Sequence, residues 1–259
     1  MSASTLSPSS ANTSTLIQVC GVSKSYGDHA VLHQIDLTVQ SGEVVAIIGT
    51  SGCGKSTLLK VIAGLEKPND GEVILGDPNF TLVFQYSALF DSLTVFENVA
   101  FSLLESPDQL PPGEKHVVPS LRQMRRKVRE KLRMVGLDES IEDQYPNELS
   151  GGMQKRVSFA RAIMSEPKII LYDEPTSGLD PVASNVLEDY IVKLRDELNV
   201  ASVVVTHTFS TIYRTANRVC LLHEGRVHWT GTPQELLKTT DPLARAFVQA
   251  ALVQDDMPS

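Results

Sequence analysis

The feature that most constrains the fold is a glycine-rich loop between a hydrophobic run and a helical pattern. The loop, Gly49–Ser56, reads GTSGCGKS and fits the pattern G-x-x-x-x-G-K-[ST]. It follows the apolar run Val44–Ile48, which predicts a buried strand, and it precedes residues 56–63, which predict a helix that stops at Gly64. Because strand, loop and helix occur in the order that the motif requires, the sequence predicts a phosphate-binding loop rather than a glycine-rich turn without a ligand.

Each part of this loop has an expected role in holding a phosphate chain. The glycines let backbone N–H groups converge on phosphate oxygens, at a helix N-terminus that carries partial positive charge. Lys55 is expected to reach the β and γ phosphates, and the Ser56 hydroxyl is expected to ligate Mg²⁺. Cys53 is interpreted as a small filler of the loop, because nothing near it in the sequence would activate its thiol.

A second hydrophobic run, Ile169–Tyr172, ends in two adjacent carboxylates, Asp173 and Glu174. In proteins with a phosphate loop such a strand runs beside that loop, so Asp173 is expected to hold the Mg²⁺ shell and Glu174 to orient or deprotonate an attacking water. The alternative is that both carboxylates are merely solvated at a strand end. The phosphate loop upstream favours the catalytic interpretation.

Short β-branched runs alternate with helical patterns along the chain, which favours parallel βα units in an α/β fold. Residues 16–22 and 35–39 are expected to be strands of a leading antiparallel portion, and residues 202–206 a further core strand. Residues 87–165 read as mainly helical and are expected to form an inserted helical subdomain. Within this subdomain, helices are expected at 95–104, at 121–135 and after Ser150; further helices are expected from the capping box at 232–235 and after Asp241.

Composition excludes several classes of function. The 259 residues carry 23 Lys plus Arg against 31 Asp plus Glu, and the resulting formal charge of −8 argues against a nucleic-acid partner. Three cysteines without a CxxC motif give no zinc site. No apolar run approaches the roughly 18 residues that a bilayer span needs. Residues 1–15, rich in Ser and Thr, are expected to be a disordered tail, and residues 254–259 a second tail.

The segment Leu149–Gln154 reads LSGGMQ, and the Asp173–Glu174 pair follows about twenty residues later. This combination resembles the ATP-binding cassette (ABC) family, whose signature is LSGGQ; Met153 stands where the pattern often has Gln. Read alone, the segment is simply a helix capped by Ser150. The resemblance extends over residues 16–253 and implies one nucleotide-binding domain: a RecA-like P-loop NTPase core with an antiparallel β subdomain and an inserted α-helical subdomain.

The resemblance assigns roles to four more positions. Tyr26 matches the aromatic that stacks on adenine, and Gln85 matches the glutamine that touches Mg²⁺ and the water. Asp180 lies in a segment that looks like the loop crossing the dimer seam, and His207 matches the histidine that contacts the γ-phosphate. Ordinary structural roles for Tyr26 and His207 stay open as alternatives.

The implied site comprises ATP ligands, metal ligands and catalytic groups. The expected nucleotide ligands are Tyr26, Gly49, Thr50, Ser51, Gly52, Cys53, Gly54, Lys55, Ser56, Thr57, Gln85, Ser150, Gly151, Gly152 and Asp180. The expected Mg²⁺ ligands are Ser56, Gln85 and Asp173, and the expected catalytic residues are Glu174, His207 and Lys55. The resemblance further implies a head-to-tail homodimer, in which each ATP lies between the phosphate loop of one copy and the Ser150–Gly152 segment of the other.

Two features depart from the family pattern. Only nine residues separate Leu75 from Gln85, fewer than expected, which concerns the size of the antiparallel subdomain. Thr208 follows His207 where Asp is frequent, which concerns the bracing of the histidine loop. Neither departure removes a chemical group from the expected site.

Among ABC proteins, a transporter ATPase fits best. A translation-factor type needs two cassettes in one chain, and a chromosome or repair type separates its two ATPase halves by a long coiled coil. Here Gly49 and Ser150 are only 101 positions apart, without sustained heptads between them. We expect the chain to pair with separate transmembrane permease subunits and to sit peripherally on the cytoplasmic face of the inner (plasma) membrane.

The cargo is inferred from similarity alone. Residues 85–101 and 241–247 resemble the Mla/Mce branch, whose cassettes drive phospholipid movement between membranes; this implies a lipid-binding partner of the Mce type. The alternative is the ATPase subunit of an importer of polar amino acids or other small solutes. Seven basic residues between 122 and 133 predict either a solvated helix face or a contact with anionic headgroups or a membrane subunit.

Overall fold

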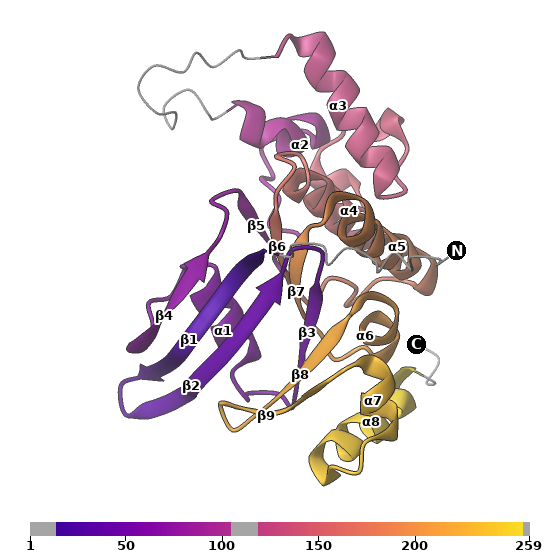
Figure 1. Ribbon diagram of the computed structural model, residues 1–259. Coiled ribbons are helices and arrows are strands. Elements are labelled where there is room, and N and C mark those ends of the chain that lie inside the picture. Colours follow the sequence, from indigo (N-terminus) through magenta and orange to yellow (C-terminus); the bar gives the residue numbers. More distant parts are fainter. Residues whose placement is uncertain (1–13, 105–118, 256–259) are drawn as a thin grey trace, which may run out of the picture.

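The computed structural model describes residues 14–104 and 119–255, which form two sheets with associated helices (Figure 1). The larger sheet has six strands in the order β5-β6-β7-β3-β8-β9. Its first five strands in this order run parallel, and β9 pairs antiparallel with β8. The strands are β3 (Val44–Ile48), β5 (Phe80–Val83), β6 (Ile169–Asp173), β7 (Ala201–Val205), β8 (Arg218–His223) and β9 (Arg226–Gly231). The expected α/β fold with a P-loop strand at its centre is confirmed.

A smaller antiparallel sheet has the strand order β2-β1-β4. Its strands are β1 (Thr15–Tyr26), β2 (His29–Gln40) and β4 (Asp70–Leu75). The first two are longer than the strands expected at residues 16–22 and 35–39. They continue through polar residues to a tight turn at Gly27, whose φ of 57° suits glycine, and hydrophobicity alone did not mark that extension.

Strand β3 shows why apolar side chains pack on both faces of the central sheet. Its five residues are fully buried, so both faces of the strand are covered. Val45 and Ile47 pack with helix α1 (Lys55–Ile62) and with the antiparallel sheet, whereas Ala46 and Ile48 pack with the C-terminal helices on the opposite face. A continuous apolar run is what a parallel strand covered on both faces requires.

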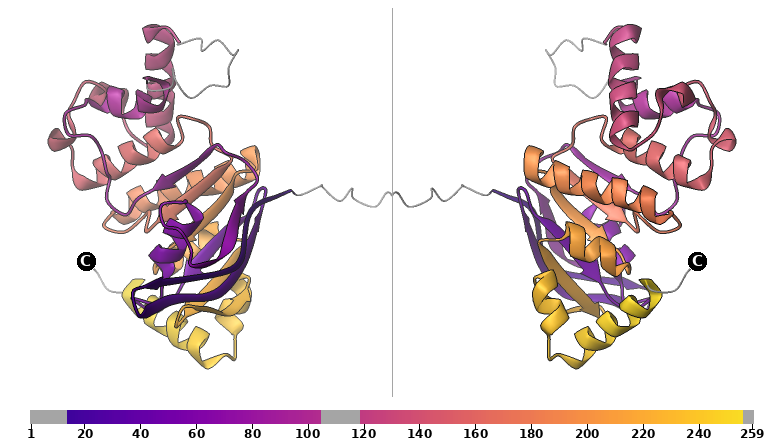
Figure 2. Two further views of the ribbon diagram at one scale, coloured as in Figure 1. Left: turned by 90° about the vertical axis from the view of Figure 1, so that its left-hand side faces the viewer. Right: turned by 90° about the vertical axis from the view of Figure 1, so that its right-hand side faces the viewer.

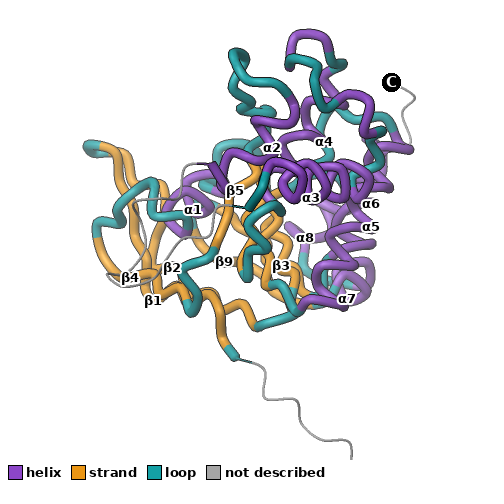
Figure 3. The backbone as a smooth tube through the Cα atoms, turned by 90° about the horizontal axis from the view of Figure 1, so that it is seen from above, coloured by secondary structure: helices purple, strands orange, loops and turns teal. Residues whose placement is uncertain are grey.

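Most of the other helices cover the face of the central sheet away from β1, β2 and β4 (Figure 3). The helical segments between residues 95 and 162 are α2 (Val95–Leu104), α3 (Leu121–Met134), the short 3-10 turns η1 (Glu139–Ile141) and η2 (Pro146–Glu148), and α4 (Gly151–Ala162). They share a core with α5 (Pro181–Leu198). The segments from α2 to α4, called the helical block below, occupy one end of the molecule, as Figure 2 shows.

The C-terminal helices lie at the other end of the molecule (Figure 2). They are α6 (Phe209–Thr215), α7 (Pro233–Lys238) and α8 (Pro242–Asp255). Strand β1 starts at Thr15 and α8 ends at Asp255, so both expected tail boundaries shift outward; residues 1–13 and 256–259 lie outside the described residues. None of the helices within residues 14–104 and 119–255 combines the length and apolarity that crossing a bilayer requires.

Candidate active site

One cavity, with a volume of about 760 Å³, gathers most of the residues expected to bind phosphate. The expected site residues that line it are Gly49, Thr50, Ser51, Gly52, Gly54, Lys55, Ser56, Thr57, Gln85, Asp173, Glu174 and His207. They come from four separate stretches of sequence. The fold therefore brings these expected site residues together around one cavity.

Parallel strand pairing explains this convergence. Ile47 in β3 pairs with Val205 in β7, and Val205 pairs in turn with Asp173 in β6. The chain leaves all three strands at the same edge of the sheet. The phosphate loop after β3, the carboxylates ending β6 and His207 after β7 therefore open into the same cavity, where α/β sheets commonly bind their ligands.

Two glycines of the loop are required by backbone geometry and by space. Gly49 has φ 148°, and a Cβ there would lie 2.3 Å from the carbonyl oxygen of Leu222. Gly54 has φ 105°, and a Cβ there would lie 2.8 Å from Cδ2 of Leu32. Only glycine fits both ends of the loop, because any side chain would collide with the neighbouring strands.

The side chain of Lys55 bonds to the backbone of its own loop. Its Nζ donates hydrogen bonds to the carbonyl oxygens of Gly49, at 2.8 Å, and Thr50, at 2.9 Å. Lys55 is also the first residue of α1, so its ammonium lies near the helix N-terminus with its partial positive charge. A lysine and a helix N-terminus facing one cavity form a surface suited to the negative oxygens of a phosphate chain.

Asp173 and Ser56 lie next to each other at the loop. The Ser56 hydroxyl is 3.5 Å from Oδ1 of Asp173, and Gln85 lines the same cavity. Burial, followed by the negative charge of Glu174, raises the pKa of the Asp173 carboxyl. Hydroxyl, carboxylate and amide oxygens are the hard ligands that Mg²⁺ prefers. The donor set therefore fits this cation.

The described part of the chain contains no cluster of three or more His, Cys, Asp or Glu residues that could hold a metal. Ser56, Asp173 and Gln85 alone are too few to complete an octahedral shell. The three residues therefore fit a cation that also takes oxygens from a bound phosphate chain.

Glu174 and His207 form a close side-chain pair in the cavity. His207 Nδ1 is 2.8 Å from Oε1 of Glu174, while Oε2 of Glu174 is buried and makes no hydrogen bond within the described residues. Glu174 has φ 49°, and its N–H donates to the carbonyl oxygen of Val205 at 2.8 Å. A carboxylate with one occupied and one free oxygen can accept a proton from a water molecule.

The His207 loop is braced without the frequent aspartate. Thr208 donates its backbone N–H to the hydroxyl oxygen of Thr206 at 3.1 Å. Thr206 itself is fully buried and donates its N–H to the carbonyl oxygen of Ile47. The brace therefore comes from the end of β7 rather than from the residue after His207.

Six expected ligands do not line the cavity: Tyr26, Cys53, Ser150, Gly151, Gly152 and Asp180. Tyr26 ends β1 and is 46 % exposed, with the Lys24 ammonium 5.0 Å from its ring centroid. Cys53 is buried beneath the loop, and burial raises the pKa of its thiol. Its buried side chain packs in the core with β3 and α1, which supports the filler role, whereas a ligand role for its backbone N–H stays a prediction.

The other residues outside the cavity begin helices. Ser150 Oγ accepts a hydrogen bond from the N–H of Met153 at 3.3 Å and caps α4. Asp180 Oδ1 accepts from the N–H groups of Val182 and Ala183, both at 2.9 Å, and caps α5. Within one chain Ser150 and Asp180 cap helices, and Gly151 and Gly152 are the first residues of α4. Any nucleotide that they contact would have to lie outside the cavity of their own chain.

The cavity also contains residues that the sequence analysis missed. They lie in β2, at the ends of β7 and β8, and along α8: Val31, Val205, Leu221, Leu222, His223, Leu243, Ala246, Phe247, Ala250 and Ala251. The spacing of Leu243, Phe247 and Ala251 predicts an apolar helix face. It does not predict which surface that face meets, because this depends on how α8 packs on the sheet.

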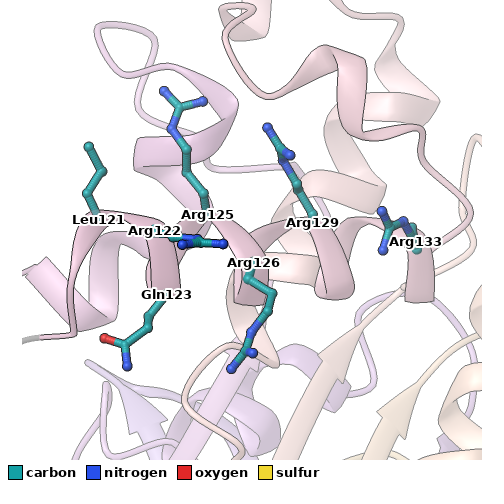
Figure 4. A pocket seen from close by; sticks show the side chains of 7 residues that line it. All are labelled: Leu121, Arg122, Gln123, Arg125, Arg126, Arg129 and Arg133. Atoms are coloured by element: carbon teal, nitrogen blue, oxygen red, sulfur yellow. The ribbon is translucent and has the colours of Figure 1, made fainter.

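The basic helix α3 presents the arginines that Figure 4 shows, and carboxylates pair with some of them. Arg125 and Arg129 both pair with the buried carboxylate of Glu142, and Arg133 pairs with Glu139. Arg122, in contrast, forms no ion pair with any residue that the structure describes. These pairs favour a structural role for much of the basic face, and a membrane contact stays a prediction.

The phosphate loop, the carboxylates ending a neighbouring strand and the histidine after the next strand define the class of P-loop NTPases. The family model for ABC transporters matches residues 32–177, more than half of the chain. The chain therefore belongs to the ABC transporter family, as an ATP-binding subunit that hydrolyses ATP.

Relatives of known name support this assignment. The chain is 40% identical over 230 residues to the sulfate/thiosulfate import ATP-binding protein CysA of Pseudomonas syringae, covering 85% of this chain and 68% of that protein. It is also 40% identical over 267 residues to the protein trigalactosyldiacylglycerol 3, chloroplastic, of Arabidopsis thaliana, covering 92% of this chain and 74% of that protein. The expected family is thus confirmed, whereas the expected lipid-transport branch is not.

Solved structures agree with the fold. A dimeric ATP-binding cassette in a post-hydrolysis state, bound to ADP and Pi, is 32% identical with a TM-score of 0.74, and the match covers 84% of this chain and 99% of that chain. The cbiO1 subunit of an ABC transporter complex from Clostridium perfringens is 26% identical with a TM-score of 0.73, covering 93% of this chain and 99% of that chain. Both are similar to this chain along almost their whole length.

Proposed function

We propose that two copies of this chain bind ATP between them and hydrolyse it to drive transport through separate membrane subunits. The observation that carries the proposal is the single cavity in which the phosphate loop, Asp173, Glu174 and His207 meet. Lys55 and the N-terminus of α1 bind the phosphates, and Glu174 draws a proton from the attacking water. His207 holds Glu174 and contacts the γ-phosphate.

A second copy completes the site in this proposal. Ser150, Gly151 and Gly152 begin α4 but lie outside the cavity of their own chain. A helix N-terminus with exposed glycine amides suits a γ-phosphate brought by another molecule. The dimeric cassette bound to ADP and Pi supports a dimer. ATP would join the two copies, and loss of the γ-phosphate on hydrolysis would separate them.

Mg²⁺ is the proposed metal, held by Ser56, Asp173 and Gln85 together with phosphate oxygens. When bound, it supplies positive charge that stabilises charge on the phosphates. The roles of Tyr26 as a stacking surface for adenine and of Asp180 as a residue at the dimer seam belong to the same proposal. Neither residue lines the cavity of a single chain.

The proposed location is the cytoplasmic face of the inner membrane, peripherally attached to permease subunits. The relatives named as import ATP-binding proteins support this partnership. A segment of the helical block near Gln85, including α2, would receive the cytoplasmic part of the permease. Attachment through this block would let ATP-driven movement of the two copies act on the membrane subunits.

Two cargo classes remain in the proposal. Import of a small solute is the better supported, because several relatives are named for sulfate/thiosulfate import. Lipid transport, with an Mce-type partner, is supported by the Arabidopsis relative named after a galactolipid, which aligns over 92% of this chain. Residues 85–101 add the resemblance noted in the sequence.

Co-purification from membranes tests the function and separates these cargoes. A tagged Glu174→Gln variant, locked with Mg-ATP, is extracted in mild detergent and its partners are identified. A permease together with a soluble solute receptor supports solute import, and a permease with a lipid-binding protein and bound lipid supports lipid transport. Recovery of the chain without any membrane subunit would refute the transport proposal.

A further inference from the structure

A lysine on α4 contacts the backbone of the catalytic loop. Lys155 Nζ donates hydrogen bonds to the carbonyl oxygen of Glu174, at 3.2 Å, and to the carbonyl oxygen of Ser177. The side chain is half-buried, so its ammonium has exchanged part of its water shell for these two carbonyls. One lysine therefore ties both ends of the turn that follows β6.

The turn needs such a tie because its first residue is strained. Glu174 has φ 49°, a conformation that residues with a side chain rarely adopt and that persists only when the surroundings hold it. Within the turn the N–H of Ser177 donates to the Glu174 carbonyl oxygen, and three contacts from outside the turn add to this: the N–H of Glu174 to Val205, its Oε1 to His207, and its carbonyl oxygen to Lys155. The lysine is the one of these three contacts that comes from the helical block.

Lys155 belongs to the helix whose N-terminus carries the signature segment. Ser150 caps α4, and Lys155 lies about one turn further along. The neighbouring Gln154 accepts a hydrogen bond from Ser87 at 3.3 Å, two residues after Gln85. The first turns of α4 therefore hold both the segment after Gln85 and the turn after Glu174.

We propose that Lys155 is a positioning residue that fixes Glu174 for hydrolysis and couples it to the signature end of α4. This rests on the proposed function, in which the signature end of α4 contacts the ATP bound to the other copy. A movement of α4 caused by that ATP would pass through Lys155 to the carboxylate that activates water at the chain's own site. The two sites of the dimer would thereby be linked through a helix of each chain.

Lys155→Met tests this, because methionine keeps much of the side-chain volume and removes the charged donor. We expect kcat for ATP hydrolysis to fall about tenfold, with the KM for ATP changed by less than about twofold, since loss of a charge-assisted bond of this kind costs about one order of magnitude in rate. Lys155→Arg, which keeps a cationic donor, is expected to recover most of the rate.

Arg195→Met is the matched control. Arg195 Nη1 also donates to a backbone carbonyl, that of Thr215 at 2.9 Å, but this carbonyl lies at the end of α6 and not in the catalytic turn. The variant removes the same charge from α5. It is expected to lower thermal stability without the loss of kcat.

A trapping experiment separates the inference from the proposed function. Glu174→Gln with Mg-ATP should form a stable dimer, and the double variant Glu174→Gln/Lys155→Met should form it to the same extent, because positioning of Glu174 matters only for hydrolysis. Failure of Glu174→Gln itself to form the dimer would refute the proposed function. A dimer that forms with Glu174→Gln but is lost in the double variant Glu174→Gln/Lys155→Met, equal losses of kcat in the Lys155 and Arg195 variants, or a Lys155→Met kcat within twofold of wild type would overturn the inference.

Discussion

His207 and Glu174 are joined side chain to side chain across the ends of two neighbouring strands, with Nδ1 of the imidazole 2.8 Å from Oε1 of the carboxylate. Glu174 follows β6 and His207 follows β7, and these strands pair in parallel through Asp173 and Val205. The contact orients the second carboxylate oxygen, Oε2, which is buried. The imidazole therefore fixes one oxygen of Glu174, and the other has no hydrogen-bond partner within the described residues.

Glu174→Gln should bind ATP but lower turnover by a factor of about 100 or more, because the amide cannot accept the proton of the attacking water. The variant should accumulate as an ATP-bound dimer. Phosphate release measures turnover, and size-exclusion chromatography with Mg-ATP measures dimerisation. Glu197→Gln, an exposed change on α5, is the control and should behave as wild type. Wild-type turnover in Glu174→Gln would remove the water-activating role.

The expected phosphate loop, carboxylate pair and histidine were predictable because each follows directly on an apolar strand. The carboxyl ends of parallel strands lie at the same edge of a sheet. Asp173 and His207 could therefore be placed near Lys55 without knowing how the helices pack. The spacing of the glycines and the polar residues that follow the strands were enough to predict this part of the site. The same local reading placed the first residues of α4 and α7 within one residue of the structure.

Contacts between distant elements were not predictable in this way. Lys155 reaches the Glu174 turn, and Phe247 on α8 lines the nucleotide cavity, only because two helices pack on particular faces of the sheet. A helical period shows that a residue faces inward, but it does not identify its neighbour. The cap of α5 by Asp180 is different, because it is a local contact that the Asp180–Pro181 pair signals and that the sequence analysis did not use.

Lys55→Ala should raise the dissociation constant for ATP by about 10 to 100-fold, because a charge-assisted contact to phosphate oxygens is lost. In the wild-type protein the Lys55 ammonium donates to the carbonyl oxygens of Gly49 and Thr50, so the variant also loses these two hydrogen bonds within the loop. Fluorescent-nucleotide titration measures the affinity. Lys193→Ala, at an exposed position on α5, should bind ATP as wild type does. Unchanged affinity in Lys55→Ala would show that the phosphate-loop assignment is wrong.

Gly49→Ala should destabilise the fold by about 2 kcal/mol, as overpacking in a tight site does. The added Cβ would lie 2.3 Å from the Leu222 carbonyl oxygen, which belongs to the backbone of β8 and cannot move alone. Gly52→Ala is the comparison, because Gly52 also has positive φ, 79°, but its Cβ would meet nothing within 4 Å. Urea unfolding measures both. Equal losses in the two variants would mean that conformation, and not the collision at Leu222, sets the cost.

Glu142 provides a pH-dependent part of the stability of the helical block. Its buried carboxylate accepts from Arg129 and Arg125, and these bonds hold its pKa below its ordinary value of 4.5. A folded-state pKa below the unfolded one stabilises the protein above pH 4.5, and that stability is lost as the pH falls through the folded-state value.

Glu142→Gln should therefore lower the free energy of unfolding by about 1 kcal/mol at pH 7, since both arginines are partly exposed and solvent screens the pairs. The difference between wild type and variant should shrink in strongly acidic solution, where the Glu142 carboxylate is protonated in both folded and unfolded states. Urea unfolding at both pH values measures it, and other carboxyl groups cancel in the difference. A gap that stays constant across the acid range would show that packing of the side chain, and not its charge, is what Glu142 contributes.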